Sequence, residues 1–346
     1  MKSKIKYLGI DIGGAHFKIV GLDEKKSVCF SEYRKCYIWK GLENLRKEID
    51  YTNSLNLQKD ASCGITMTAE LCDNFKSKKQ GAIEISRLCK KLNFNYSFYT
   101  NSQKIFSKNM QKNYKNVISM NWHSIGRYFL TKFDNLMVVD FGSTTTDFIC
   151  IKNSKIVNDG LEDFSRLTKK EMLYTGITRT PLFGLQHEIS FRKKKYHIVP
   201  ELFSNTSDIY RINNFIEKDF DIDDEADNGG KRTLESLLRI SRSFCIDYEK
   251  NKRNLVYGLS KILIDNQVKK INLNINYLLK KKNLKKNTPI LFTGIGRKIL
   301  VKKIKNTSTL KIEKLIRANN IKLKNFASHH TPAFCVAQLL ADLKKL

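Results

Sequence analysis

The stretch Gly9-Ile10-Asp11-Ile12-Gly13-Gly14 lies near the start of this 346-residue chain and decides its fold. Residues 7–12 are apolar and predict a strand, the glycine pair permits a tight turn, and residues 15–22 predict a second strand. Glycines let the backbone turn and bring its N–H groups against phosphate oxygens. The pattern therefore predicts a hairpin whose turn, at Gly13 and Gly14, binds phosphate; a plain hairpin turn is the alternative.

The carboxylate of Asp11 ends the first predicted strand and would face an anion bound at the turn. Because a carboxylate repels phosphate, we expect Asp11 to hold Mg²⁺ or the water ligands of that ion. His16, just beyond the turn, either touches the phosphate or packs against its neighbours.

The opening pattern returns in the middle of the chain as Val139-Asp140-Phe141-Gly142-Ser143-Thr144-Thr145-Thr146-Asp147. Residues 136–141 predict a strand, residues 142–146 a small-residue turn, and residues 147–151 a second strand. The phosphate-binding candidates of this second turn are its N–H groups and hydroxyls, at Gly142, Ser143, Thr144 and Thr145. Asp140 is a metal-ligand and catalytic candidate and Asp147 a further acid, whereas a polar hairpin capped by Asp147 is the plainer alternative. An internal repeat of this kind predicts two lobes of related construction.

A third glycine turn follows late in the chain, at Thr293-Gly294-Ile295-Gly296. Residues 289–292 predict a buried strand, and Arg297 begins a predicted helix whose N-terminus can approach a nucleotide or another anion. Gly294 and Gly296 are therefore further phosphate-binding candidates.

The order of these three turns resembles that of the superfamily containing acetate and sugar kinases, Hsp70 and actin. The resemblance predicts an α/β, two-lobed actin-like ATPase fold, ribonuclease H-like in topology, with a ligand cleft between the lobes. We place the N-terminal lobe at residues 1–134 and the C-terminal lobe at 135–346. The latter carries a loop-rich insertion facing the cleft at about 175–230, in which the acidic residues 221–227 predict a solvent-exposed loop.

Composition bears on partners and on cellular location. The formal net charge is +29, but the basic residues are spread along the chain without a nucleic-acid-binding signature, so we expect no specific nucleic-acid partner. The eight cysteines form no C-x-x-C pair, which argues for a reducing compartment and against a zinc site. With no apolar run long enough to span a bilayer and no signal-like start, we expect a cytoplasmic protein without a membrane partner.

Several strings carry a closer resemblance, namely residues 8–16, 65–73, 121–122, 140–147, 173–181 and 201–210. The most specific is Tyr174-Thr175-Gly176-Ile177-Thr178-Arg179-Thr180-Pro181. On these strings the chain resembles the hydantoinase/oxoprolinase-related proteins of one-carbon metabolism. The resemblance implies a diphosphate-releasing alkyl or aryl transferase of methanofuran or methylofuran biosynthesis, beside tetrahydromethanopterin-linked one-carbon transfer.

In the implied reaction, the phenol oxygen of a γ-glutamyl-tyramine-like acceptor displaces diphosphate from an aminomethyl-furanmethanol diphosphate. Mg²⁺ and the phosphate turns would stabilise the departing diphosphate, and a general base must take the proton of the phenol. Candidates for this base are Glu70, Asp73 and Asp147. Glu70 is favoured because it follows a predicted strand within a matching string, whereas Asp73 can instead cap a helix. Arg179 can bind phosphate or the acceptor's carboxylate, or form an internal salt bridge.

Two other classes of function remain open on the sequence. The first is an ATP-dependent small-molecule kinase or a hydantoinase/oxoprolinase-type hydrolase on the same fold, which ADP formation would reveal. The second is a non-catalytic sensor of a metabolite and nucleic acid, which rests on the charge alone, since no DNA-binding domain is visible.

Overall fold

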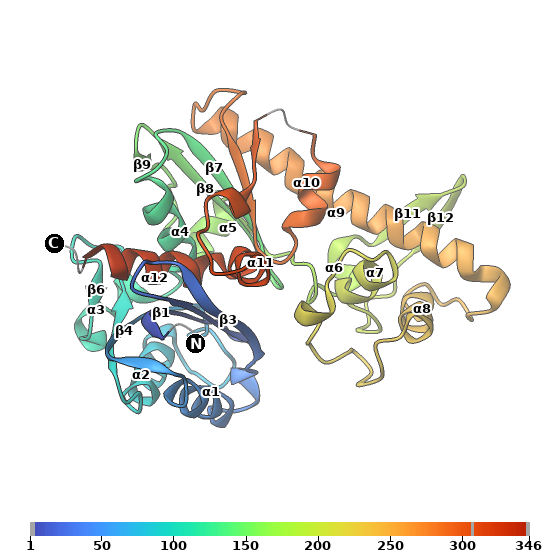
Figure 1. Cartoon of the computed structure of the whole chain (residues 1–346). Coiled ribbons are helices and arrows are strands. Elements are labelled where there is room, and N and C mark those ends of the chain that lie inside the picture. Colours follow the sequence, from blue (N-terminus) through green and yellow to red (C-terminus); the bar gives the residue numbers. More distant parts are fainter. Residues whose placement is uncertain (1–3, 306–307, 344–346) are drawn as a thin grey trace. The chain divides into compact units, whose positions relative to one another are not determined.

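The computed structural model describes residues 4–305 and 308–343 (Figure 1). The strands are β1 (Ile5–Ile12), β2 (His16–Leu22), β3 (Val28–Lys35), β4 (Leu57–Met67), β5 (Asn95–Tyr99), β6 (Phe106–Ser107), β7 (Leu136–Phe141), β8 (Thr146–Lys152), β9 (Lys155–Ile156), β10 (Met172–Leu173), β11 (Glu188–Phe191), β12 (Lys194–His197), β13 (Ile290–Thr293) and β14 (Thr309–Leu310). The α-helices are α1 (Glu43–Asn53), α2 (Lys78–Cys89), α3 (Met110–Val117), α4 (Asn121–Phe129), α5 (Asp163–Thr168), α6 (Leu182–Leu185), α7 (Thr206–Ile212), α8 (Thr233–Arg242), α9 (Arg253–Lys281), α10 (Arg297–Lys303), α11 (Ile321–His329) and α12 (Thr331–Leu343). Short 3₁₀ helices lie at Ile38–Lys40, Lys218–Phe220, Lys250–Lys252 and Ile312–Lys314.

The first sheet has the strand order β3-β2-β1-β4-β5-β6. Strands β1, β2 and β3 form an antiparallel meander, and β4 and β5 join it in parallel pairings, each after a helical crossover. Such crossovers place helices on the faces of a sheet. Strand β1 is accordingly buried along most of its length, and its carboxyl end leads directly into the first glycine turn.

The second sheet has the order β10-β8-β7-β13-β14, with β9 paired to β8. The hairpin β7–β8 stands where β1–β2 stands in the first sheet, and the late strand β13 adjoins β7 as β4 adjoins β1. The internal repeat predicted from the two glycine turns is therefore visible in the strand order. All three predicted turns follow central strands of these sheets.

Contacts divide the chain into two compact units. The first unit comprises Met1–Val138, Ile149–Lys169 and Leu310–Leu346, and the second comprises Val139–Phe148 and Lys170–Thr309. The C-terminal helices α11 and α12 thus group with the first unit rather than with residues 170–309. The division predicted at residues 134 and 135 stays a prediction, because compact contact units need not be independently folding domains.

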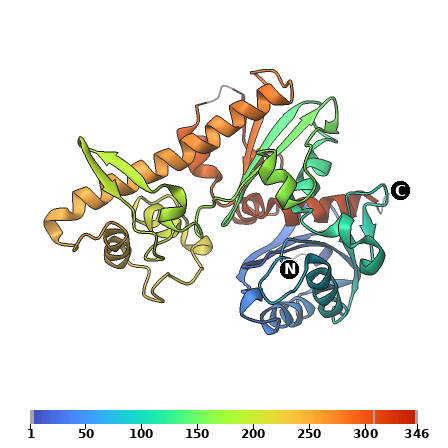
Figure 2. The same ribbon diagram turned by 180° about the vertical axis from the view of Figure 1, so that it is seen from behind.

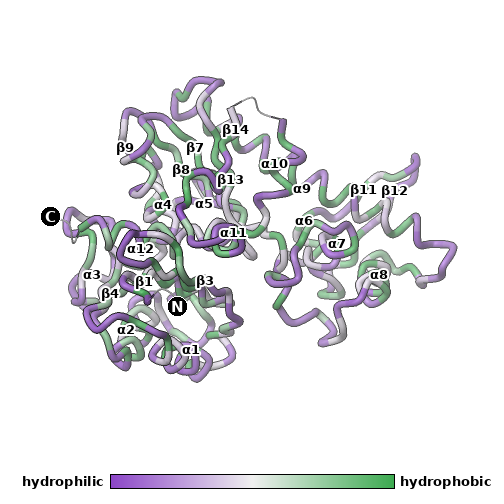
Figure 3. The backbone as a smooth tube through the Cα atoms, viewed as in Figure 1, coloured by the Kyte–Doolittle hydropathy of each residue, from purple (hydrophilic) through white to green (hydrophobic). Residues whose placement is uncertain are grey.

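The core of the first unit lies between its sheet and the helices that cover it. Helix α12 packs on β1, β2 and β4, whereas α1 and α2 lie on the other face (Figure 1). Ile10, Ile65 and Ile85, from β1, β4 and α2, are all buried in one hydrophobic cluster. Figure 3 shows hydrophobic residues concentrated along the strands and hydrophilic residues at the loops.

In the second unit the long helix α9 contacts α6, α7, α8 and β11 (Figure 2). The insertion predicted as loop-rich therefore contains regular elements, including the β11–β12 hairpin. Arg192 and Lys193 at its tip have φ angles of 49° and 62°, as two-residue hairpin turns require. Among the described residues, none of the helices is long and apolar enough to cross a lipid bilayer.

Candidate functional site

The first glycine turn joins β1 to β2 in the first unit. It closes with a hydrogen bond from the N–H of Gly13 to the carbonyl oxygen of His16, at 2.9 Å. The side chains of Thr68 and Cys72, which follow β4, lie against the turn glycines. His16 is buried and stacks on Tyr33 with a centroid distance of 4.5 Å, so packing is the role that the structure shows for it.

Asp11 is fully buried at the end of β1. Its Oδ2 accepts a hydrogen bond from Lys18 Nζ at 2.7 Å, across the hairpin where the two residues are paired. Its Oδ1 is also buried and accepts no hydrogen bond from another described residue. A buried carboxylate oxygen without a donor is a ligand of the kind that Mg²⁺ prefers, so Asp11 fits its predicted role.

Lys18 is a residue of this turn that the sequence reasoning missed. Its ammonium lies beside Gly13 as well as on Asp11, and its side chain is 20% exposed. The available signal was its position opposite Asp11 in the predicted hairpin, which places the two side chains on the same face of the sheet. A partly exposed cation next to N–H groups of a glycine turn suits a phosphate ligand.

The second glycine turn joins β7 to β8 in the same manner. The N–H of Gly142 donates to the carbonyl oxygen of Thr145 at 2.9 Å, which is the closing bond of the first turn repeated. Ser143 and Thr144 are half-buried, and their hydroxyl oxygens lie 3.4 Å apart. Asp147 is buried and accepts a hydrogen bond from the Thr145 hydroxyl at 3.1 Å. The structure thus brings Asp147 back to the turn that precedes it.

The segment Gly176 to Arg179 braces this second turn through its backbone. The N–H groups of Thr178 and Arg179 both donate to the carbonyl oxygen of Ser143, at 3.2 and 3.1 Å, and Ile177 N–H donates to that of Gly142 at 3.0 Å. A Cβ on Gly176 would stand 2.0 Å from the Ser143 oxygen, so only glycine permits this approach. The string singled out in the sequence is therefore a support of the second turn.

Gln267 of helix α9 supports the bracing segment from behind. Its Nε2 donates to Thr175 Oγ1 at 2.8 Å and to the carbonyl oxygen of Gly176 at 3.0 Å, while its Oε1 accepts from Tyr210 at 2.8 Å. Gln267 and Tyr210 are both buried. Both the nitrogen and the oxygen of the Gln267 amide are therefore hydrogen-bonded, which holds the side chain in one orientation.

The third glycine turn meets the second one within the second unit. Asp140 Oδ1 accepts a hydrogen bond from the Thr293 hydroxyl at 2.7 Å, and Gly296 N–H donates to the carbonyl oxygen of Phe141 at 2.9 Å. Gly294 has a φ of 81°, and a Cβ there would lie 2.7 Å from Asp140 Oδ1. The predicted residues of the second and third turns therefore gather around Asp140.

Glu70 follows β4 in the first unit and is 1% exposed. Its Oε1 accepts a hydrogen bond from the Ser119 hydroxyl at 2.6 Å, and its buried Oε2 accepts none from another described residue. Burial raises the pKa of Glu70 to about 7, against the lowering effect of the Ser119 bond. A carboxyl group with such a pKa can take up and release a proton near neutral pH. Asp73 is exposed, and the helix-cap role considered for it is wrong, because Ser77 caps α2.

The Arg179 guanidinium contacts Asp223, with Nη1 and Oδ1 3.5 Å apart, and 27% of its side chain remains exposed. The internal salt bridge considered for Arg179 is therefore present but long. Its remaining exposure leaves room for an anionic ligand at the same guanidinium.

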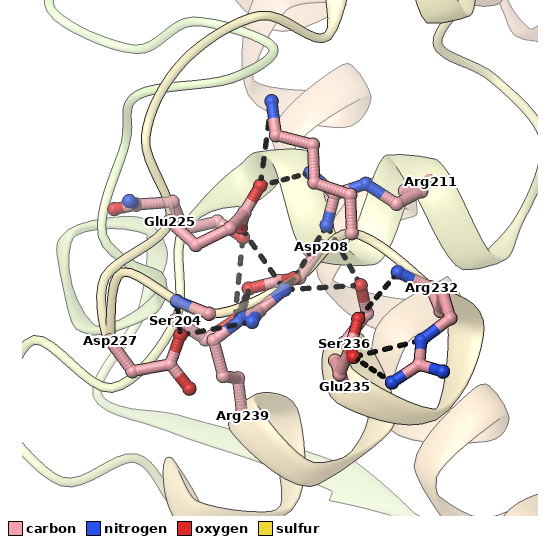
Figure 4. Close-up of polar contacts among 12 residues, drawn as sticks. Ser204, Asp208, Arg211, Glu225, Asp227, Arg232, Glu235, Ser236 and Arg239 are labelled. Atoms are coloured by element: carbon pink, nitrogen blue, oxygen red, sulfur yellow. Dashed lines mark hydrogen bonds and ion pairs between the residues drawn. The ribbon is translucent and has the colours of Figure 1, made fainter.

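The acidic segment 221–227 is part of a buried ion-pair network (Figure 4). Arg239, fully buried, contacts Asp208 at 2.7 Å and Glu225 at 3.1 Å, and Arg211 contacts Asp208 at 2.9 Å and Asp221 at 2.6 Å. The predicted solvent-exposed loop is therefore wrong for Glu225, which is 5% exposed. Glu225 lies inside because Arg211 of α7 and Arg239 of α8 pair with it.

The described residues contain no cluster of three or more His, Cys, Asp or Glu side chains that could hold a metal ion. Mg²⁺ does not require such a cluster, because it usually keeps several waters and binds through one or two carboxylates plus ligand phosphates. The donor sets around Asp11 and around Asp140 with Asp147 fit this mode of binding.

The chain is similar in sequence to two synthases. The (4-{4-[2-(gamma-L-glutamylamino)ethyl]phenoxymethyl}furan-2-yl)methanamine synthase of Methanocaldococcus jannaschii is 31% identical over 349 residues, which cover 97% of this chain and 98% of that protein. The protein of the same name from Methanococcus vannielii is 32% identical over 217 residues, covering 60% of this chain and 91% of that one.

Among solved structures, a chain of the PilM-PilN type IV pilus biogenesis complex superposes with a TM-score of 0.50 at 8% identity. The superposition covers 97% of this chain and 98% of that chain, and at such low identity it bears on the fold alone. Together with the repeated sheet order, it confirms the α/β actin-like ATPase fold predicted from the three turns. The family model for hydantoinase/oxoprolinase proteins matches residues 63–341. The chain therefore belongs to the hydantoinase/oxoprolinase family.

Proposed function

We propose that this protein is a transferase of methanofuran-type cofactor biosynthesis that forms an aryl ether and releases diphosphate. Its substrates would be an aminomethyl-furanmethanol diphosphate and a phenol of the γ-glutamyl-tyramine type. The observation that carries the proposal is the near full-length similarity to a synthase whose name specifies a phenoxymethyl-furan product.

The chemistry of that product explains what a site must do. Dividing the ether at the bond between oxygen and methylene leaves a phenol and a furfuryl carbon that must carry a leaving group. A furfuryl carbon supports cation-like character. Binding the departing group and neutralising its charge should therefore make the largest contribution to lowering the activation barrier. Glycine turns that offer N–H groups, with a cation beside the first and hydroxyls at the second, suit a diphosphate in this role.

The residues of the three turns receive their roles from this requirement. Ser143 and Thr144 would donate hydroxyls to the phosphate oxygens, and Lys18 would add a positive charge beside Gly13. Asp11 in the first unit and Asp140 in the second are each proposed as ligands of Mg²⁺, which when bound supplies positive charge to the leaving diphosphate. The exposed part of Arg179 would bind a second anionic group, either phosphate or the carboxylate of the acceptor.

Glu70 is the proposed general base. The phenolic proton passes to a carboxylate oxygen of Glu70 while the phenol oxygen forms its bond to the methylene carbon. The bond from that carbon to the diphosphate oxygen breaks, and diphosphate leaves with the electron pair. A pKa of about 7 leaves a large fraction of Glu70 ionised at neutral pH yet basic enough to accept the proton.

The test supplies purified protein with Mg²⁺, the furan diphosphate and the phenolic acceptor, without ATP. We expect ether formation by mass spectrometry and an equal amount of diphosphate by a coupled assay. Omitting the acceptor should abolish diphosphate release, which controls for hydrolysis.

The competing function on this fold is ATP-dependent phosphorylation or hydrolysis. It would be favoured by the absence of ether together with ADP formation that depends on the acceptor when ATP is supplied. Ether formation that proceeds only with ATP would also contradict the proposed reaction, because diphosphate on the furan already activates it.

A further inference from the structure

Ser119 has an unusual backbone for a buried residue. Its φ angle is 54°, in the left-handed region that residues other than glycine rarely adopt. Of the non-glycine residues with positive φ in the described part of the chain, Ser119 alone is buried, at 1% exposure. Strained conformations of this kind persist where surrounding structure imposes them, and they cluster at functional sites.

The surroundings of Ser119 connect it to the end of β4. Its neighbour Ile118 forms an isolated parallel bridge with Met67, the last residue of that strand. Its hydroxyl donates to Glu70 Oε1 at 2.6 Å, which is a short and well-formed bond to a carboxylate. The backbone bridge and the side-chain bond together hold one oxygen of Glu70 in a single place.

We propose that Ser119 is a positioning residue that occupies Oε1 of Glu70 and thereby leaves Oε2 as the oxygen that accepts the phenolic proton. The inference rests on the proposed function and deepens it. Oε2 is buried and accepts no hydrogen bond from another described residue, so it is the oxygen available to a ligand proton. A base held through one oxygen presents the other in a fixed orientation, which proton transfer requires.

The charges around Glu70 set the direction of the expected pH effect. Burial raises its pKa most, Asp163 at the start of α5 also raises it, and Lys78 at the start of α2 lowers it, with a net pKa of about 7. The Ser119 bond also lowers the pKa, because it stabilises the ionised form. Removing the hydroxyl therefore raises the pKa of Glu70, and less of the base is ionised at neutral pH.

The first variant is Ser119→Gly, which deletes the hydroxyl while suiting the positive φ, so that the fold is retained. Infrared spectroscopy of protein with ¹³C-labelled glutamate, with Glu70→Gln subtracted, follows the Glu70 carboxyl directly and needs no substrate. We expect its titration midpoint to rise by about one unit. Ser124→Ala is the matched control, since that buried hydroxyl donates to the carbonyl oxygen of Asn121 and should leave the midpoint unchanged.

The second measurement is kcat/KM for ether formation against pH. In Ser119→Gly the acidic limb should move upward by the same amount as the infrared midpoint, with roughly a tenfold loss of rate below it. An unmoved infrared midpoint would overturn the positioning role. A midpoint that moves while the acidic limb stays would overturn Glu70 Oε2 as the proton acceptor. Absence of ether formation in the unaltered protein would instead reject the proposed function, independently of the infrared result.

Discussion

The two glycine turns share a backbone but differ in the charges that surround it. In each, an aspartate precedes the first turn glycine by two positions, and that glycine closes the turn with a 2.9 Å hydrogen bond. Seven positions after the aspartate, the first turn has Lys18 and the second has Asp147. The same scaffold therefore presents a cation at one turn and a second carboxylate at the other.

The two turns therefore offer a ligand different charges, although their sequence patterns are alike. Asp11 is paired with Lys18, so the first turn is close to neutral before a ligand arrives. Asp140 accepts from the neutral hydroxyl of Thr293, and Asp147 adds a further acid to the same turn. Asp11 and Asp140 both stay candidates for Mg²⁺, and the ammonium of Lys18 adds a positive charge that suits a phosphate group at the first turn.

The largest expected effect is that of Asp140→Asn on turnover. The amide retains an oxygen for the Thr293 hydroxyl but loses the charge that a metal needs, so we expect kcat to fall by about 1,000-fold with little change in melting temperature. Steady-state kinetics across Mg²⁺ concentrations, with calorimetry, measures both. In Asp11→Asn we expect lower stability as well, because Lys18 loses its carboxylate. Equal destabilisation by Asp140→Asn and Asp11→Asn would contradict the larger structural role assigned to the ion pair between Asp11 and Lys18.

The next effect concerns how rigidly the second turn is held. Gly176→Ala should destabilise the protein by about 3 kcal/mol or more, because its Cβ would meet the Ser143 carbonyl oxygen at 2.0 Å. Gly184→Ala is the matched control from a nearby segment, where the nearest atom, a Thr180 methyl, lies at 3.7 Å. Urea denaturation of both variants tests the bracing. Similar stabilities would mean that the backbone of the bracing segment shifts without cost.

Removing the charge at the two equivalent positions, Lys18 and Asp147, gives a smaller effect. Lys18→Gln should cost roughly 2 kcal/mol, less than a fully buried pair would, because the Lys18 side chain is 20% exposed while Asp11 is fully buried. The double variant with Asp11→Asn should recover most of that loss, since no unpaired charge remains. Asp147→Asn is the equivalent change at the second turn, where it removes a negative charge but keeps an acceptor for the Thr145 hydroxyl. Thermal unfolding of the unaltered protein and of the three variants measures how much each of these charges contributes to stability.

The parts of these turns that the sequence predicts are those encoded locally. An apolar run ending in Asp, followed by small residues, specifies a strand and a turn whatever surrounds them, and so the hairpins at Gly13 and Gly142 and the turn at Gly294 appear where expected. Strand β3 was missed because charged residues such as Glu32 and Arg34 interrupt its apolar pattern. Its strand conformation comes from pairing with β2, which is a tertiary contribution.

In the candidate site, too, the features that local sequence does not predict are those that depend on distant residues. Glu70 stands out in the sequence because it follows a strand, but its hydrogen bond comes from Ser119, 49 positions away. The acids of 221–227 read as a solvated loop because their arginine partners lie on separate helices, α7 and α8. Charge and burial of a side chain depend on such distant partners, and no local pattern encodes them.

The smallest expected effect is that of Thr146→Val. Thr146 follows Asp140 by six positions, as Phe17 follows Asp11 in the first hairpin. Phe17 is buried among apolar residues of the first core, whereas the buried Thr146 donates its hydroxyl to the carbonyl oxygen of Thr175 at 2.8 Å. Thr146→Val keeps the shape but leaves that carbonyl without this donor, so we expect a loss of about 1 to 2 kcal/mol by urea denaturation. Thr145→Val, at a half-buried position where water can replace the hydroxyl, should cost less. If Thr146→Val proved neutral, the second turn would rest on its backbone contacts alone, and the polar side chains that distinguish it from the first would be free to serve the ligand.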